Sequence, residues 1–299
     1  MPALREIRAS LEREIDQAGP ESIACLGQRL ATTGADWSYY PNDPLARRIH
    51  HLLADRVLSQ DPILFGTEHL DAVRGNPLVI VANHLSYSDA NLLEVLFHRA
   101  NRSEVSDRLT VVTGPKVYSD VRRRFSSLCF GTIKTPQSRA RSSDEAVMNA
   151  REVAVAARRS IEIARDRLQR GDALLVFAEG SRSRSATLVR FLAGVSRYLD
   201  QADVWVLPVG IAGSESLFPI AENALKPVHV ATRVGRPIRA GVLRERAQGD
   251  RQLMMDAIGM AVAGQLPERY RGVYGDDARE LDSARRLLKE VQSNDLRKL

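Results

Sequence analysis

The sequence predicts an α/β protein with a central, mostly buried mixed sheet that is flanked by helices. From residue 73 onward, short apolar runs alternate with segments whose apolar residues recur at helical spacing. Most of these runs are continuously apolar, which is typical of strands covered on both faces. The first 72 residues show mainly helical spacing, so a small helical N-terminal element is expected before the sheet.

The N-terminal element, residues 1–72, contains three helical segments that are separated by Gly and Pro. The expected helices are 2–17, 20–33 and 44–58. The element is too polar to be interpreted as a membrane anchor, and an amphipathic helix at a membrane interface remains the alternative.

The central part, residues 73–240, is the expected α/β domain. Its strands are expected at 78–82, 109–113, 132–135, 174–178, 204–209 and 229–234. Its helices are expected at 89–100, 117–128 and 142–168. The last helix has the clearest periodicity, and Gly171 follows its end.

The C-terminal extension, residues 241–299, returns to helical spacing at 249–264 and 278–298. No chemistry is identified in this part of the sequence. One apolar stripe indicates a packing face, which consists of Leu281, Ala284, Leu287, Leu288 and Val291.

The net charge of +6 is concentrated in one segment. Residues 99–141 contain ten Lys or Arg and three acids, so the rest of the chain is close to neutral. Such a segment can attract anionic phospholipid, an acidic carrier protein or a phosphorylated substrate, or it can be a solvated face. Nucleic acid is disfavoured because aromatic residues are not interleaved with the basic ones.

Several classes of protein are disfavoured by features that the sequence lacks. No apolar run approaches the length of a membrane-spanning helix, and the N-terminus has no apolar signal core. Cys25 and Cys129 lie too far apart for a metal or redox motif. We therefore expect a cytoplasmic protein that binds no metal and that can lie peripherally at the inner membrane face.

One motif lies where the expected strand 78–82 gives way to a helix. Asn83 and His84 follow the strand directly, and Asp89 comes five residues after His84. Neutral imidazole can take a proton near pH 7, and a neighbouring carboxylate can fix its tautomer. The turn after a strand is also where open α/β sheets place their ligands. Taken alone, such a pair is more often a structural histidine with satisfied hydrogen bonds than a catalytic one.

A second motif follows the expected strand 174–178. It contains Glu179, Gly180 and Ser181, and then two arginines, Arg182 and Arg184. A carboxylate directly after an apolar run needs a partner, which we expect to be an arginine or a bound hydroxyl. The guanidinium groups suit phosphate, although an exposed Ser-Arg loop is the alternative interpretation.

Together the two motifs resemble those of the acyltransferases of glycerolipid synthesis. That family carries an N-H-x-x-x-x-D block and, downstream, an F-P-E-G-T-R-S-R block. In this chain Ala178 stands in place of the proline and Ser181 in place of the threonine. The resemblance covers roughly residues 62–240.

Two further blocks of the family match less completely. Residues 206–211, with Pro208, are similar to the fourth block. Residues 130–134 stand in place of the second block, G-x-x-F-I-x-R, of which Gly131 and one apolar position are kept. The basic residue of this block corresponds to Lys134, Arg139 or Arg141.

The resemblance implies the transfer of a fatty acyl group from a thioester to a hydroxyl. It implies that His84 is the general base and that Asp89 orients the imidazole and compensates its charge. The residues implied to bind the acceptor or its phosphate are Glu179, Gly180, Ser181, Arg182, Arg184 and Lys134. Ser86 and Ser88 are disfavoured as nucleophiles because neither lies in a G-x-S-x-G elbow.

The resemblance also implies the partners. The donor is expected to be acyl-CoA or acyl-carrier protein, and the acceptor lysophosphatidate or a related glycerol phosphate. The segment 191–195 favours lysophosphatidate, whereas the helical N-terminal element is similar to the glycerol-3-phosphate enzymes. A non-catalytic lipid- or carrier-binding module on the same scaffold is a further hypothesis.

Overall fold

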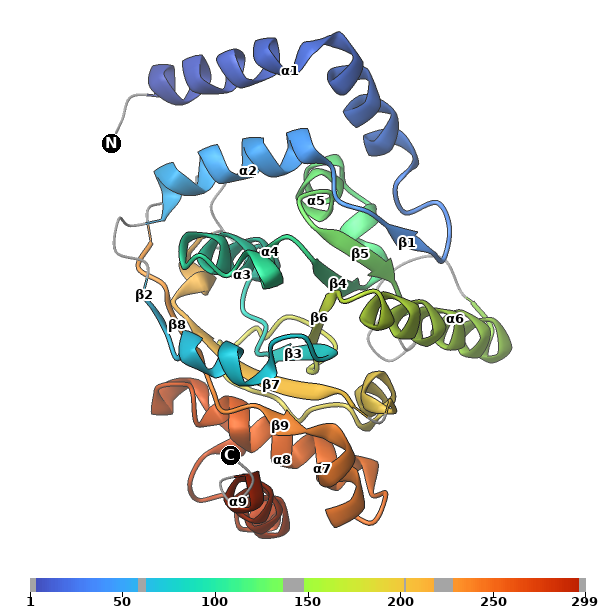
Figure 1. The fold of residues 1–299 in the computed structure, drawn as a ribbon, viewed down its shortest axis with the longest axis vertical. Helices are drawn as coiled ribbons and strands as arrows, with labels where there is room; N and C mark the ends of the chain where they lie inside the picture. Colours follow the sequence, from blue (N-terminus) through green and yellow to red (C-terminus); the bar gives the residue numbers. More distant parts are fainter. Residues whose placement is uncertain (1–3, 59–62, 137–147, 202, 218–227, 296–299) are drawn as a thin grey trace. The chain divides into compact units, whose positions relative to one another are not determined.

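The computed structural model describes residues 4–58, 63–136, 148–201, 203–217 and 228–295 (Figure 1). The chain forms two compact units, and each unit is built from three separate segments of the sequence. The first unit comprises Met1–Pro62, Ala90–Ala164 and Ser216–His229. The second unit comprises Ile63–Asp89, Arg165–Glu215 and Val230–Leu299.

The first unit begins with two helices, α1 (Leu4–Thr32) and α2 (Pro44–Val57), which pack against each other (Figure 1). Gly19 has a φ of 77° and precedes Pro20, so α1 is kinked where the sequence predicts two helices. The carboxylate of Asp43 caps α2 by accepting the N–H groups of Leu45 and Ala46.

The sheet of the first unit contains β1 (Tyr39–Tyr40), β4 (Leu109–Thr113) and β5 (Gly131–Lys134). Strand β5 pairs parallel to β4 and antiparallel to β1. The helices of this part are α3 (Asp89–Arg99), α4 (Ser103–Ser106), α5 (Val121–Ser127) and α6 (Ala150–Gln169).

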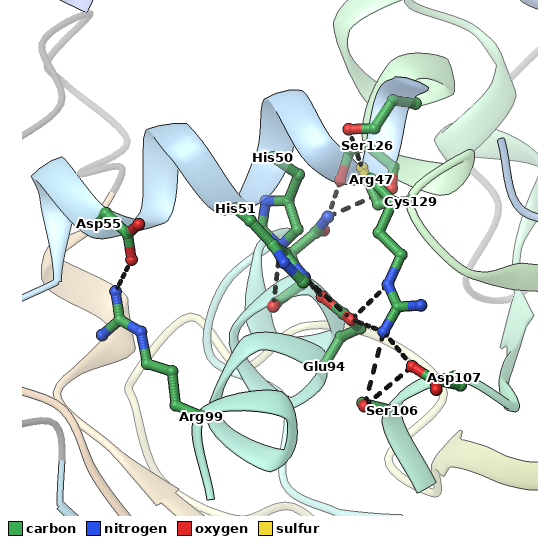
Figure 2. Close-up of polar contacts among 12 residues, drawn as sticks. Arg47, His50, His51, Asp55, Glu94, Arg99, Ser106, Asp107, Ser126 and Cys129 are labelled. Carbon is green, nitrogen blue, oxygen red and sulfur yellow. Dashed lines mark hydrogen bonds and ion pairs between the residues drawn. The ribbon is translucent and has the colours of Figure 1, made fainter. Parts of the chain in front are cut away.

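A buried ion cluster joins α2 to α3 within the first unit. Figure 2 shows Arg47 and His51 directed from α2 toward Glu94 of α3, whose side chain is 0% exposed. Arg47 lies 2.8 Å from Glu94 and 2.7 Å from Asp107, and Nε2 of His51 lies 2.8 Å from Glu94. His50 donates through Nε2 to the carbonyl oxygen of Asn91 at 3.0 Å, and burial lowers the pKa of this ring.

The second unit contains a mixed sheet in the order β6-β3-β7-β8-β2, and β9 also pairs with β7. Strand β3 (Leu78–Ala82) runs parallel to β6 (Ala173–Phe177) and β7 (Trp205–Ala212). Strands β8 (Ala231–Val234) and β9 (Ile238–Arg239) are antiparallel to β7, whereas β2 (Ile63–Phe65) is parallel to β8. Parallel and antiparallel pairs occur in this one sheet and every residue of β3 is buried, which confirms the expected mixed, mostly buried sheet.

Three helices complete the second unit, namely α7 (Ala240–Arg246), α8 (Arg251–Ala263) and α9 (Asp282–Asp295). Helix α8 packs on β7, and α9 packs on α8. Most of the predicted apolar stripe packs inward: Leu281, directly before α9, and Ala284, Leu287 and Val291 on it are buried, whereas Leu288 is half-buried.

The predicted strands 78–82 and 109–113 are confirmed at the same residues. The short strands β1, β2 and β9 and helix α7 were not predicted. Arg139, Arg141 and the first residues of the predicted helix 142–168 lie outside the described residues, and α6 is described from Ala150 onward. No helix in the described ranges has both the length and the apolar character that crossing a bilayer requires.

Candidate active site

Asn83 fixes the point at which β3 ends. Its side-chain amide donates to the carbonyl oxygen of Ile211 at 2.8 Å and accepts the N–H of Ile211 at 2.7 Å. This buried side chain therefore continues the pairing of β3 with β7 for one more position. His84 follows at the carboxyl edge of the sheet in the second unit.

The imidazole of His84 is bonded to the carboxylate of Asp89. Nδ1 of the ring lies 2.8 Å from Oδ2 of Asp89. The same oxygen accepts the N–H groups of Leu85 at 2.6 Å and Ser86 at 2.8 Å. Because an ionised carboxylate can only accept hydrogen bonds, Nδ1 of His84 must donate to it. The neutral ring therefore carries its proton on Nδ1 and its lone pair on Nε2.

Ser214 completes the surroundings of Asp89, and the sequence analysis did not identify it. Its buried hydroxyl donates to Oδ1 of Asp89 at 2.6 Å. Ser214 begins the 3₁₀ turn Ser214–Ser216 after β7, and Gly213 before it has a φ of 92°. The available signal was a Gly-Ser-Glu sequence at the end of a third buried strand, where polar side chains meet those of β3 and β6.

Phe177 covers one face of the His84 ring. The two rings are stacked with their centroids 4.1 Å apart and their planes 18° apart. Phe177 is the last residue of β6, which pairs directly with β3. The packing and the Asp89 bond together fix the orientation of the imidazole, whose side chain remains 17% exposed.

Glu179 is buried and accepts backbone hydrogen bonds. Its Oε1 accepts the N–H of His84 at 2.8 Å, and its Oε2 accepts the N–H of Val189 at 3.0 Å. Burial raises the pKa of Glu179 to about 6. Both of these partners are backbone amides, and the arginine or bound hydroxyl that the sequence leads us to expect stays a prediction.

The turn after Glu179 reaches the loop that carries His84. Gly180 has a φ of 72°, a conformation that favours glycine, and the N–H of Ser183 donates to the carbonyl oxygen of His84 at 2.8 Å. The guanidinium of Arg182 lies 4.6 Å from the ring centroid of Tyr87. Ser181 and Arg184 are exposed on the same turn.

These contacts bring together most of the predicted site residues in the second unit. Lys134 belongs to the first unit, where its ammonium donates to the carbonyl oxygen of Gly34 at 2.6 Å and lies over the ring of Trp37. Burial lowers the pKa of Lys134. Across the described part of the chain, no group of three His, Cys, Asp or Glu side chains is arranged to hold a metal ion.

Comparison with known proteins identifies a family over the part of the chain that contains both motifs. The model of the family described as Acyltransferase matches residues 65–212, which include both motifs. The crystal structure of the 1-acyl-sn-glycerophosphate (LPA) acyltransferase PlsC from Thermotoga maritima is similar with a TM-score of 0.44 and 15% identity, over 84% of this chain and 76% of that chain. None of the curated proteins compared matches the chain. The family match encloses the His84–Asp89 pair and the Glu179 turn, so residues 65–212 form an acyltransferase-family domain and the chain is an acyltransferase.

Proposed function

We propose that this protein moves a fatty acyl group from a thioester to a hydroxyl of lysophosphatidate or a related glycerol phosphate. The observation that carries the proposal is the 2.8 Å bond between Nδ1 of His84 and Asp89, inside the stretch that matches the acyltransferase family. It leaves Nε2 of His84 as the basic nitrogen of a ring whose orientation is fixed.

His84 acts as a general base in this proposal. Nε2 removes the proton of the acceptor hydroxyl while its oxygen attacks the thioester carbonyl. Asp89 stabilises the imidazolium that forms. When the tetrahedral intermediate collapses, the C–S bond breaks and the imidazolium returns the proton to the departing sulfur. The products are an ester and a thiol, and no acyl-enzyme is formed.

Glu179 supports this chemistry indirectly. Its carboxylate accepts the backbone N–H groups of His84 and Val189, so it positions the turn, and Glu179 stays a predicted acceptor ligand. The acceptor phosphate is assigned to Arg182 and Arg184, with Ser181 beside them, because a guanidinium binds phosphate with two parallel hydrogen bonds. Lys134 stays a predicted phosphate ligand.

The donor is acyl-CoA or acyl-carrier protein, and both are anionic. The basic segment 99–141 suits either donor or an anionic membrane surface. Within it, α5 begins with Val121 and Arg122, whose side chain is 89% exposed. We propose peripheral membrane contact through this segment. Weakened binding to anionic vesicles when Arg122 and Arg123 are changed to Glu would support that contact, and unchanged binding would contradict it.

Release of the thiol from an acyl thioester tests the activity, with lysophosphatidate and glycerol 3-phosphate as competing acceptors. Faster release with glycerol 3-phosphate would identify the alternative acceptor. His84→Ala should lower turnover by a factor on the order of 10² or more, because no other base replaces the ring. Asp89→Asn should also lower it strongly, since an amide keeps the shape of the side chain but loses the charge.

His69→Ala is the matched control, because His69 lies in the same unit and outside this site. Turnover should be unchanged in this variant. Full activity in His84→Ala would end the proposed mechanism. Binding of acyl thioester and lipid by the wild type without transfer to any acceptor would favour the non-catalytic module instead.

A further inference from the structure

The C-terminal extension contains a tyrosine that contacts the loop beneath Asp89. Tyr270 lies in a 3₁₀ turn, Glu268–Tyr270, and is 2% exposed. Its hydroxyl accepts the N–H of Gly213 at 3.1 Å and donates to Oε1 of Glu215 at 2.6 Å. The hydroxyl thus bonds to the residue before Ser214 and to the residue after it.

Ser214 transmits this constraint to the imidazole. Its hydroxyl donates to Oδ1 of Asp89 at 2.6 Å, and Oδ2 of Asp89 is bonded to His84. We propose that Tyr270 is a positioning residue that sets Ser214, and through it Asp89, for the base His84. This inference rests on the proposed function and adds to it a residue 58 positions beyond residue 212, where the stretch that matches the family ends.

The backbone of Tyr270 holds a second loop of the site. The N–H of Leu188 donates to the carbonyl oxygen of Tyr270 at 2.9 Å, and the N–H of Val273 donates to the carbonyl oxygen of Leu188 at 3.2 Å. Val189, the next residue, is the one whose N–H bonds to Glu179. Tyr270 is therefore bonded to the loop beneath Asp89 and to the loop beside Glu179.

Gly272 makes the second contact possible. It has a φ of 50°, and a Cβ atom at this position would lie 2.1 Å from the carbonyl oxygen of Leu188. A side chain would push the two segments apart, so the close approach requires glycine. The carbonyl of Leu188 could not then accept the N–H of Val273.

The Tyr270 hydroxyl remains protonated, as a donor to Glu215 must be. Burial raises the pKa of Tyr270, and the hydrogen bond to Glu215 raises it further. Arg269 also contacts the hydroxyl, with Nη2 3.2 Å from the oxygen, and opposes that rise. A bond from a neutral hydroxyl to a carboxylate is stronger than a neutral pair, which suits a role in fixing a turn.

Tyr270→Phe is the first test because it removes the hydroxyl and keeps the buried ring. We expect kcat to fall by about tenfold or more with KM within twofold of the wild type, since the acceptor site is not touched. Tyr274→Phe is the matched control. Tyr274 is also buried, and its hydroxyl bonds to Asp256 and to the N–H of Phe191, with no link to Ser214 in the described contacts.

A second pair of variants keeps the test valid if Tyr270→Phe folds poorly. Glu215→Gln retains an oxygen that can accept from Tyr270, whereas Glu215→Ala does not. We expect Glu215→Gln to keep kcat within about threefold of the wild type and Glu215→Ala to lose as much as Tyr270→Phe. Equal losses in both Glu215 variants would overturn the role of the hydroxyl bond.

A spectroscopic measurement separates this inference from the proposed function. In protein with ¹⁵N-labelled histidine, the downfield proton of the His84 Nδ1–Asp89 bond should shift in Tyr270→Phe and stay in place in Tyr274→Phe. If the signal shifts in Tyr270→Phe alone but the protein acylates no tested acceptor, the proposed function is contradicted and the inference is supported. Unchanged kcat and an unchanged signal in Tyr270→Phe, or equal changes in both tyrosine variants, would overturn the inference.

Discussion

The carboxylate of Glu179 holds the backbone, rather than the ring, of His84, with a distance of 2.8 Å between Oε1 and the His84 nitrogen. The two residues are 95 positions apart and come from the ends of adjacent parallel strands. The motif that contains Glu179 therefore positions the motif that contains His84. Glu179 acts on the imidazole indirectly, through the backbone of His84.

Glu179→Ala should lower both stability and turnover. The change removes the acceptor of the His84 N–H in a buried setting, which costs about 1–3 kcal/mol in the free energy of unfolding. Urea denaturation and the thiol-release assay measure the two effects. Glu68→Ala, at an exposed acid of the same unit, is the control and should change the free energy of unfolding by less than about 0.5 kcal/mol. Equal stability of the two variants would contradict the assigned contacts.

The stability contributed by Glu179 should depend on pH. Burial raises its pKa from 4.5 to about 6, so the folded protein holds a proton that the unfolded chain has released. The contribution is fully present below pH 4.5 and is lost as the pH rises through about 6. The difference in free energy of unfolding between the wild type and Glu179→Ala should therefore be about 2 kcal/mol larger at pH 4 than at pH 7. Urea denaturation at matched ionic strength measures this difference. If the difference stays constant between pH 4 and pH 7, the raised pKa of Glu179 is disproved.

Arg182→Lys should weaken acceptor binding and spare the chemical step. Lysine keeps the charge, but it loses the planar fork that bonds phosphate through two N–H groups and stacks on Tyr87. We expect KM for the phosphorylated acceptor to rise by about tenfold, since one good hydrogen bond to a charged group contributes 1.5–3 kcal/mol. Steady-state kinetics with varied acceptor measure this, and Arg74→Lys at an exposed ion pair is the control. A lower kcat at unchanged KM would argue against phosphate binding by Arg182.

Glu94→Ala should destabilise the first unit strongly. The change leaves the guanidinium of Arg47 and the ring of His51 beside an empty buried site, and removal of one partner of a buried ion pair costs about 3–5 kcal/mol. Arg74→Ala breaks the exposed Arg74–Asp71 pair and should cost less than about 1 kcal/mol. Thermal and urea unfolding compare the two variants. Similar small losses would show that the cluster does not stabilise the packing of α2 on α3.

The sequence predicts the central strands well because their physical signal is local. A continuous apolar run such as 78–82 can be covered only by packing on both faces, and it is confirmed as β3. Strand β1 has two residues and pairs with β5 from far along the chain, so no periodicity could reveal it. The same holds for β9, which is also two residues long.

The contacts of the site also divide into those that the sequence predicts and those that it does not. His84 and Asp89 are five residues apart across one turn, so their contact is visible in the sequence and the structure confirms it. Ser214 contacts Asp89 across 125 positions, and the partners of Glu179 are backbone amides, which have no residue identity to recognise. Tyr270 lies in a part of the chain without any recognisable motif, and only the fold reveals its contact with the turn that carries Ser214.

The stretch shared with the family ends at residue 212, just ahead of the turn in which Ser214 meets Asp89. A fragment that ended at residue 212 would contain His84 and Asp89. It would lack Ser214, which bonds to Asp89, and Tyr270, which bonds to the turn of Ser214. We therefore expect the smallest self-sufficient catalyst to extend beyond Tyr274, and homologues with shorter tails to brace the same aspartate by other means.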